Sequence, residues 1–142
     1  MPKIPKVIHF CWFGGAEYPD LIKNCMASWE KYLPEYEIVK WSEENFDVNC
    51  NQYVKEAYEN KKWAFITDYV RLYALYNYGG VYLDSDVEVL KPIDEFLDNE
   101  AFSGFESRDT VPTAIMASVK GQRFMGELLH DYDNRKLILE DG

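Results

Sequence analysis

The amino-acid sequence predicts an α/β fold in which helices flank a mostly parallel sheet. Short apolar segments alternate along the chain with longer segments of helical periodicity, and this alternation is typical of strand–helix–strand units. The 142 residues are 47% hydrophobic and 16% aromatic, which argues against disorder and is enough for one domain with a core of its own. We therefore expect one folded unit built around a single sheet.

The first strand and the first helix are predicted near the N-terminus. Lys6–Phe13 is apolar and aromatic and ends at a Gly-Gly pair, a pattern that indicates a buried strand running into a turn. In Asp20–Leu33 the apolar residues recur at the i, i+3, i+4 and i+7 positions of an amphipathic helix, and a proline follows directly. Tyr36–Trp41 alternates as a second strand, and a further helix is expected at Gln52–Asn60.

The longest helix is predicted at Lys62–Tyr78. Apolar and aromatic side chains cover most of its circumference, so we expect it to be buried. Gly79 and Gly80 directly after it indicate a left-handed C-cap, and Gly80–Asp84 then predicts a strand. Beyond this strand, the pattern predicts strands at Val87–Lys91, Ala101–Glu106 and Thr113–Ser118, a helical turn at Pro92–Phe96 and a helix at Gly121–Tyr132.

No internal repeat, low-complexity tract or linker divides the chain. After the last predicted helix the sequence ends without a closing element. We therefore expect residues 1–142 to form the N-terminal part of a single domain whose C-terminal part is missing.

The composition excludes several classes of protein. A net charge of -10 would repel DNA or RNA at long range, so nucleic acid is not expected as a partner. The 3 cysteines form no CxxC pair and indicate neither a disulfide framework nor a zinc site. No apolar run approaches the roughly 18 residues that a membrane span needs. The N-terminus also lacks the apolar stretch of a signal peptide, so we expect a cytoplasmic protein.

Two carboxylates lie at the end of the predicted strand Gly80–Asp84. Asp84 and Asp86 are separated by Ser85, and in an extended segment they point to the same side because side chains alternate. Ligands of open α/β sheets bind beyond the carboxyl ends of the strands, and carboxylate oxygens are the ligands that Mg²⁺ and Mn²⁺ prefer. A solvated acidic turn is the alternative, but carboxylates at the end of a buried strand need a cation or hydrogen-bond donors.

A polar pair lies upstream on the long predicted helix. Asp68 and Arg71 are spaced i, i+3 and therefore share one helix face. One interpretation is a surface ion pair worth roughly a few tenths of a kcal/mol. The surrounding residues are apolar enough to indicate burial instead, and the turn at Gly79 brings the helix beside the acidic strand. We therefore expect Asp68 and Asp84 to approach one pocket.

Together these motifs resemble glycosyltransferase family 32, whose members carry a DXD motif. The family includes bacterial capsular-polysaccharide enzymes and yeast-type mannosyltransferases, and the pattern is also similar to the clostridial toxin glucosyltransferases. The order and spacing of the motifs are more specific than any one of them. The resemblance rests on Asp68-x-x-Arg71, the Gly79-Gly80 turn, Tyr82-x-Asp84-x-Asp86 and the segment Ile4–Gly15.

The resemblance implies a Rossmann-like GT-A fold that binds a nucleoside-diphosphate sugar, with UDP favoured. It implies transfer to a saccharide acceptor with retention of anomeric configuration, and Mn²⁺ or Mg²⁺ as the cofactor. It also implies synthesis of capsular or other surface polysaccharide at the inner face of a bacterial membrane. Nothing after Asp86 matches the further metal and phosphate contact that family members take from their C-terminal part. A donor-binding fragment without activity is therefore a second hypothesis.

The family's pattern implies roles for individual residues. Asp86 would ligate the metal directly, and Asp84 would contact the donor ribose or sugar and reach the metal through water. Asp68 and Arg71 would hold sugar hydroxyls. Trp12 would stack on the base, with core packing as the alternative. The other donor-binding residues are expected to be Cys11, Thr67, Tyr82 and Ser85.

A phosphatase is a third hypothesis. The string VYLDSDVEV matches the nucleophile motif of haloacid-dehalogenase-type phosphatases, in which Asp84 would be the nucleophile and Asp86 the acid/base. That motif normally lies on the first strand, whereas here it lies past the middle of the chain. Asp68 and Arg71 also have no role in the phosphatase scheme, so the sequence favours the sugar transferase.

Overall fold

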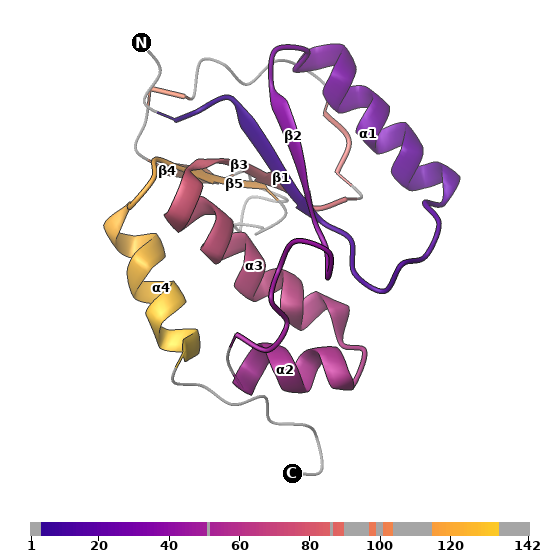
Figure 1. Ribbon diagram of the computed structural model, residues 1–142. Coiled ribbons are helices and arrows are strands. Elements are labelled where there is room, and N and C mark those ends of the chain that lie inside the picture. The colour runs from indigo at the N-terminus through magenta and orange to yellow at the C-terminus, as the bar shows by residue number, and fades with distance from the viewer. Residues whose placement is uncertain are drawn as a thin grey trace, which may run out of the picture.

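The structure is a computed structural model that describes residues 4–50, 52–85, 87–89, 97–98, 101–103 and 115–133 (Figure 1). Each element in this part of the chain corresponds to one expected from the sequence, with bounds shifted by one or a few residues. In chain order the elements are β1 (Val7–Cys11), α1 (Asp20–Tyr32), β2 (Glu37–Trp41), α2 (Gln52–Glu59), α3 (Trp63–Tyr78), β3 (Gly80–Leu83), β4 (Ala101–Ser103), β5 (Ile115–Ser118) and α4 (Arg123–Asp133).

The described strands form one sheet in the order β2-β1-β3-β5-β4. β1 pairs in parallel with β2 and with β3, and the register puts Cys11 opposite Trp41 and His9 opposite Tyr82. β5 is antiparallel to both of its neighbours, β3 and β4, so within the described sheet it alone runs against the other strands. The expected α/β class is confirmed. The described sheet is mixed, because two of its four pairings are antiparallel, although all of its strands except β5 run in the same direction. The sequence pattern did not predict the reversed strand.

Helices cover both faces of the sheet (Figure 1). α3, with α2 and α4 packed against it, lies on one face, and α1 lies on the other. Alternate strand residues divide between the two faces, as the pleat requires. Cys11 and Tyr82 pack in the cluster beneath α3, whereas Phe10 packs in the cluster beneath α1. We call these two sides of the sheet the α3 face and the α1 face.

Two glycines join α3 to β3, where the chain turns back into the sheet. Gly79 has φ 74° and ψ 170°, a region almost restricted to glycine, and Gly80 has φ 123°. A Cβ on Gly80 would lie 2.6 Å from the carbonyl oxygen of Val7, and one on Gly79 would lie 2.7 Å from the amide nitrogen of Lys120. The C-cap is where the sequence predicts it. Its ψ is not that of a left-handed helical residue, because the chain extends at once into β3.

The prediction of a strand at Val87–Lys91 is wrong for the described residues, Val87–Val89. Two of their backbone groups bond to side chains of α1 instead of to another strand. The Trp29 indole N–H donates to the carbonyl oxygen of Val87, and the N–H of Val89 donates to the Ser28 hydroxyl oxygen, both at 2.8 Å. The valines pack in the cluster of the α1 face. The rest of that predicted strand and the predicted helical turn after it lie outside the described residues.

Candidate functional site

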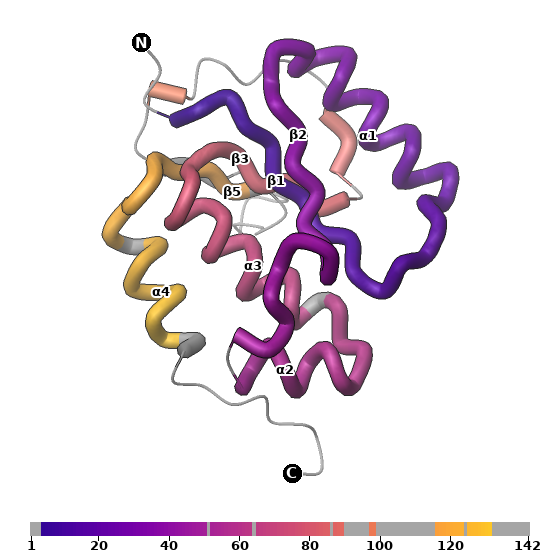
Figure 2. Tube along the Cα trace, viewed as in Figure 1, coloured from indigo at the N-terminus to yellow at the C-terminus, as the bar shows by residue number. Residues whose placement is uncertain are grey.

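A cleft of about 280 Å³ opens where β1 and β3 end next to each other in the sheet. Three segments meet there, namely the end of β1 with the loop after it, the start of α3, and the turn after β3; Figure 2 follows their course. Four residues predicted to bind a donor, Cys11, Trp12, Thr67 and Ser85, therefore lie together although they are far apart in the sequence. The cleft is lined by Cys11, Trp12, Phe13, Ala16, Trp63, Thr67 and Ser85.

Trp12 contributes a half-buried aromatic ring to this cleft. Its indole N–H donates to the carbonyl oxygen of Ala16 at 2.7 Å, and its ring meets the ring of Tyr18 edge to face with 5.0 Å between centroids. The backbone N–H of Trp12 donates to the carbonyl oxygen of Trp41 at 2.8 Å, which continues the pairing of β1 with β2. These contacts hold the ring in one orientation and leave part of it accessible from the cleft.

Trp63 lines the cleft from the start of α3 and was not among the residues predicted from the sequence. Its ring centroid lies 5.6 Å from that of Tyr58, and it packs so closely on Gly14 that a Cβ there would lie 3.1 Å from the indole. The N–H of Gly14 donates to the Glu43 carboxylate at 3.0 Å. The Gly-Gly pair after the first strand was a sequence signal for a loop at this position. It did not indicate Trp63, because the contact between that loop and the start of α3 is a tertiary one.

Cys11 and Tyr82 add a buried polar layer between the sheet and α3. Burial raises the pKa of the Cys11 thiol to about 12, although hydrogen bonds with Tyr82 and Thr67 lower it in part. Burial also raises the pKa of Tyr82 well above its usual value, and the charges of Cys11 and Asp84 and a hydrogen bond to Asp84 raise it further. Both groups therefore stay protonated near neutral pH. Cys11 is not a nucleophile, and the Tyr82 hydroxyl donates to Asp84.

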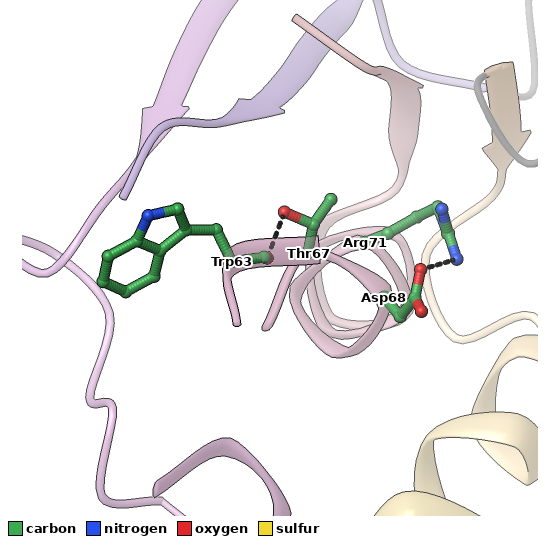
Figure 3. A network of polar contacts seen from close by, with 4 residues as sticks. All are labelled: Trp63, Thr67, Asp68 and Arg71. Atoms are coloured by element: carbon green, nitrogen blue, oxygen red, sulfur yellow. Dashed lines mark hydrogen bonds and ion pairs between the residues drawn. The ribbon is translucent and has the colours of Figure 1, made fainter. Parts of the chain in front are cut away.

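Asp68 and Arg71 form an ion pair on α3, with 2.9 Å between carboxylate oxygen and guanidinium nitrogen (Figure 3). The Arg71 side chain is 9% exposed and the Asp68 side chain 38%, so this is not a pair lying wholly on the surface. The Arg71 guanidinium lies 5.7 Å from the centre of the Tyr82 ring, which links α3 to β3. In Figure 3 the pair lies on the far side of Thr67 from Trp63. Neither Asp68 nor Arg71 is among the residues that line the cleft, although Thr67 on the same helix is.

Asp84 follows β3 and is half-buried, and a hydrogen bond of 3.0 Å from the Val87 N–H to its carbonyl oxygen closes the turn that follows. Asp86, the predicted direct metal ligand, lies outside the described residues. Within those residues, no group of three or more His, Cys, Asp or Glu side chains is placed to hold a metal ion. Magnesium can also be bound in another way, by one or two carboxylates together with phosphate oxygens of the ligand. The position of Asp84 next to Ser85 of the cleft fits this way of binding an ion.

Comparison with known proteins gives a family for this arrangement. Residues 19–103 match the family model described as "Glycosyltransferase sugar-binding region containing DXD motif". Inositol phosphoceramide mannosyltransferase 3 of Schizosaccharomyces pombe is 29% identical over 136 residues, which cover 90% of this chain and 37% of that protein. Inositol phosphoceramide mannosyltransferase 1 of the same yeast is 31% identical over 116 residues, covering 72% of this chain and 34% of that protein.

The chain thus spans about a third of the length of these curated relatives. Among solved structures, the PaToxG glycosyltransferase superposes with a TM-score of 0.73 at 17% identity, covering 91% of this chain and 60% of that one. At this identity the likeness concerns the fold alone, and it agrees with the expected GT-A fold. No helix in the described ranges is long and apolar enough to cross a membrane.

Proposed function

Because this chain belongs to the glycosyltransferase family that has a sugar-binding region with a DXD motif, we propose that it transfers a sugar from a nucleoside-diphosphate sugar to a saccharide acceptor. The observation that carries the proposal is the convergence of Trp12, Thr67 and Ser85 on one cleft beyond two neighbouring parallel strands. Open α/β sheets bind nucleotides at this position. Within the wider family we propose glycosyltransferase family 32. The phosphatase hypothesis is not retained, because the acidic residues follow β3 and not the first strand.

The nucleotide base would stack on Trp12, whose ring is already oriented by Ala16 and Tyr18. UDP is the nucleotide that we propose first. The Thr67 hydroxyl donates to the carbonyl oxygen of Trp63 at 3.0 Å. Its oxygen, which also shares a hydrogen bond with Cys11, can accept one further hydrogen bond from the ribose. Ser85 offers a second hydroxyl in the lining of the same cleft.

Asp84 and Asp86 would hold Mn²⁺ or Mg²⁺ together with the diphosphate. When bound, such an ion stabilises the charge that develops on the departing diphosphate. The chain carries a net charge of -10, so a diphosphate approaching two carboxylates without a cation would be repelled. We therefore propose that donor binding depends on the metal.

The sugar would be held by Asp68 and Arg71. Arg71 is fixed by burial and by the Tyr82 ring, and it orients the more exposed Asp68 carboxylate through their ion pair. A carboxylate fixed in this way accepts hydrogen bonds from sugar hydroxyls and positions the donor for attack. Retention of anomeric configuration is part of the same proposal.

The activities named for the relatives suggest an acceptor to test first. Three relatives from S. pombe are inositol phosphoceramide mannosyltransferases, so we propose mannose as the sugar and a lipid-linked inositol phosphate as the acceptor to test first. A capsular or other surface polysaccharide is the second acceptor class. We propose that the reaction takes place in the cytoplasm, with the protein bound peripherally at the inner face of a membrane.

Titration calorimetry of this chain with UDP, GDP and ADP, each in Mn²⁺, Mg²⁺ or EDTA, tests the proposal. We expect one nucleotide to bind with metal and to lose about tenfold or more in affinity in EDTA. Equal affinities with and without metal would contradict the metal bridge, and no binding by any nucleotide would contradict the donor site. Hydrolysis assays with UDP-glucose, UDP-galactose and GDP-mannose then separate an active transferase from an inactive donor-binding fragment.

A further inference from the structure

The hydrogen bond from the Val87 N–H to the Asp84 carbonyl oxygen closes a turn that begins at Asp84, which we call the acidic turn. Two side chains of α1 hold the segment that follows it. Trp29 is fully buried and donates its indole N–H to the carbonyl oxygen of Val87, and the buried Ser28 accepts from the N–H of Val89, each at 2.8 Å. Figure 2 shows this short segment running alongside α1. The end of the acidic turn is thus attached to a helix on the face of the sheet opposite α3.

The two hydrogen bonds have the spacing of a sheet ladder. In an extended strand the carbonyl of one residue and the N–H two residues later point to the same side, and here those groups belong to Val87 and Val89. The Ser28 hydroxyl donates to the carbonyl oxygen of Cys25, which leaves its lone pairs to accept from Val89. Removing the Ser28 hydroxyl would leave the buried N–H of Val89 without its present partner. Removing the Trp29 indole would do the same to the carbonyl of the half-buried Val87.

The acidic turn is therefore anchored at both ends. On its N-terminal side, β3 lies in the middle of the sheet between β1 and β5. On its C-terminal side, Val87 has both of its backbone groups engaged. Its N–H donates to the carbonyl oxygen of Asp84, and its carbonyl accepts from Trp29. A shift of the Trp29 indole would therefore be passed through one residue to the backbone of Asp84.

We propose that Ser28 and Trp29 are positioning residues for the acidic turn. Neither lines the cleft, so they act through the backbone of Val87 and Val89 and fix where the Asp84 carboxylate stands relative to the donor diphosphate. This inference rests on the proposed function, because it takes the turn to bind the metal and the diphosphate. Some groups orient the ligands of a metal without touching the metal, and removing such a group typically lowers metal affinity or activity by about 10- to 100-fold.

The chain offers closely matched variants. Trp29→Phe keeps a buried ring and removes the N–H, Ser28→Ala removes the acceptor, and Ser28→Thr retains it. Trp41→Phe is the control, because it removes a buried indole N–H that donates to His9 at 3.0 Å in the sheet, away from the acidic turn. The control reproduces the chemical change without touching the proposed anchor.

Two measurements test the inference. Amide hydrogen exchange across Val87–Val89 should accelerate by about tenfold or more in Trp29→Phe and Ser28→Ala, and should be unchanged in Ser28→Thr and Trp41→Phe. Calorimetry with UDP should show an affinity about tenfold lower in Mn²⁺ for Trp29→Phe and Ser28→Ala. Their affinity in EDTA should equal that of wild type, because the base contacts lie at Trp12.

An unchanged affinity in Mn²⁺ for both Trp29→Phe and Ser28→Ala would overturn the inference. The same loss in Trp41→Phe, or an equal loss in Mn²⁺ and in EDTA, would also overturn it, because either would mark general destabilisation. If Trp29→Phe does not fold, the comparison of Ser28→Ala with Ser28→Thr decides. Failure of the wild-type chain itself to bind UDP or GDP in Mn²⁺ would overturn the proposed function, and the inference with it.

Discussion

The two faces of the sheet are built from different chemistry. The α3 face buries polar groups among its aromatic side chains, including His9, Arg71 and Ser118. The cluster of the α1 face consists of apolar and aromatic side chains, and Ser28 is the buried polar residue described beside it. The cleft draws Cys11 and Thr67 from the α3 side and Trp12 from the α1 side, where the Trp12 ring packs against the cluster of that face. The contribution of α1 itself is to hold the backbone after the acidic turn.

This contrast suggests a division of labour between the faces. Burying a polar group costs free energy unless it is hydrogen-bonded, and the α3 face accepts this cost at several positions, each with a partner such as the Asp68 carboxylate for Arg71. We infer that these groups serve binding or a fixed geometry. Substitutions on the α3 face should then change folding, ligand contacts or protonation, and substitutions at Ser28 and Trp29 should change the placement of the acidic turn.

The largest effect is expected at the junction between α3 and β3. Gly80→Ala would place a Cβ 2.6 Å from the carbonyl oxygen of Val7, in addition to the φ of 123°. Strain of this kind costs about 3 kcal/mol or more when a backbone clash is added. Gly15→Ala is the control, because Gly15 has φ 74° with nothing within 4 Å of the added Cβ, so about 1–2 kcal/mol is expected. Urea unfolding followed by tryptophan fluorescence measures the free energy of unfolding of both variants. An equal loss in Gly80→Ala and Gly15→Ala would contradict the clash with the Val7 carbonyl.

The next effect concerns the polar pair on α3. Asp68→Asn keeps the size of the side chain and removes its charge, so the sugar should lose its positioning carboxylate while the base and diphosphate keep their contacts. We expect turnover of the sugar donor to fall by about 100-fold, with UDP affinity in Mn²⁺ and the melting temperature little changed. A parallel loss of UDP affinity and stability would show a structural pair instead.

Glu127→Gln is the matched control for that substitution. Glu127 pairs with Arg123 on α4 at 3.2 Å, with side chains that are 63% and 92% exposed. Such surface pairs contribute roughly 0–1 kcal/mol, so neither turnover nor stability should change measurably. Loss of turnover in this control would show that the assay responds to helix charges in general and not to the pair of Asp68 and Arg71.

The sequence was sufficient to predict the parts of the site that follow from rules about strand ends. Cys11 ends β1 and Trp12 directly follows it, and Ser85 follows β3. Because parallel neighbouring strands end at the same edge of a sheet, these residues meet once β1 pairs with β3. Thr67 joins them because α3 packs on both strands. The roles of these residues toward a donor are still predictions.

Trp63 and Val87–Val89 show what local patterns could not supply. Trp63 lines the cleft where the loop of Gly14 packs against its indole, a contact between segments far apart in the sequence. The alternating valines predict a strand, yet their hydrogen-bonding partners are two side chains of α1. The direction of β5 was equally undetermined, because alternation shows which side chains share a face and not which way a strand runs.

Trp12 gives a further test, because its ring lines the cleft and also packs against the cluster of the α1 face. Trp12→Ala should weaken UDP binding by about 1–3 kcal/mol, the range for stacking of a base on an aromatic ring. Because this contact involves no metal, the loss should be equal in Mn²⁺ and in EDTA, unlike the metal-dependent loss expected for Trp29→Phe. Calorimetry measures both. Normal binding by the variant, or its unfolding, would identify Trp12 as a core residue.

The smallest effect concerns a buried titratable group of the α3 face. The sequence gives His9 no motif role and places it inside a strand, and in the structure both ring nitrogens are engaged. The Trp41 indole N–H donates to Nδ1 at 3.0 Å, and Nε2 lies 2.9 Å from the carbonyl oxygen of Gly79. Because an indole N–H only donates, Nδ1 is the acceptor and Nε2 carries the proton. The neutral ring therefore satisfies both neighbours.

Protonation of His9 should therefore destabilise the fold. Burial lowers its pKa below the usual 6.5, although the bond to the Gly79 carbonyl and the charge of Glu37 oppose this in part. The unfolded chain then takes up a proton at a higher pH than the folded chain, so stability is complete above pH 6.5 and falls as the pH drops below it. We expect urea midpoints to fall between about pH 7.5 and pH 5.5, and to fall less in His9→Gln, which has no proton to take up. His130→Asn, at an exposed position on α4, should keep the slope of wild type. A slope for His9→Gln equal to that of wild type would assign the acid sensitivity to other groups.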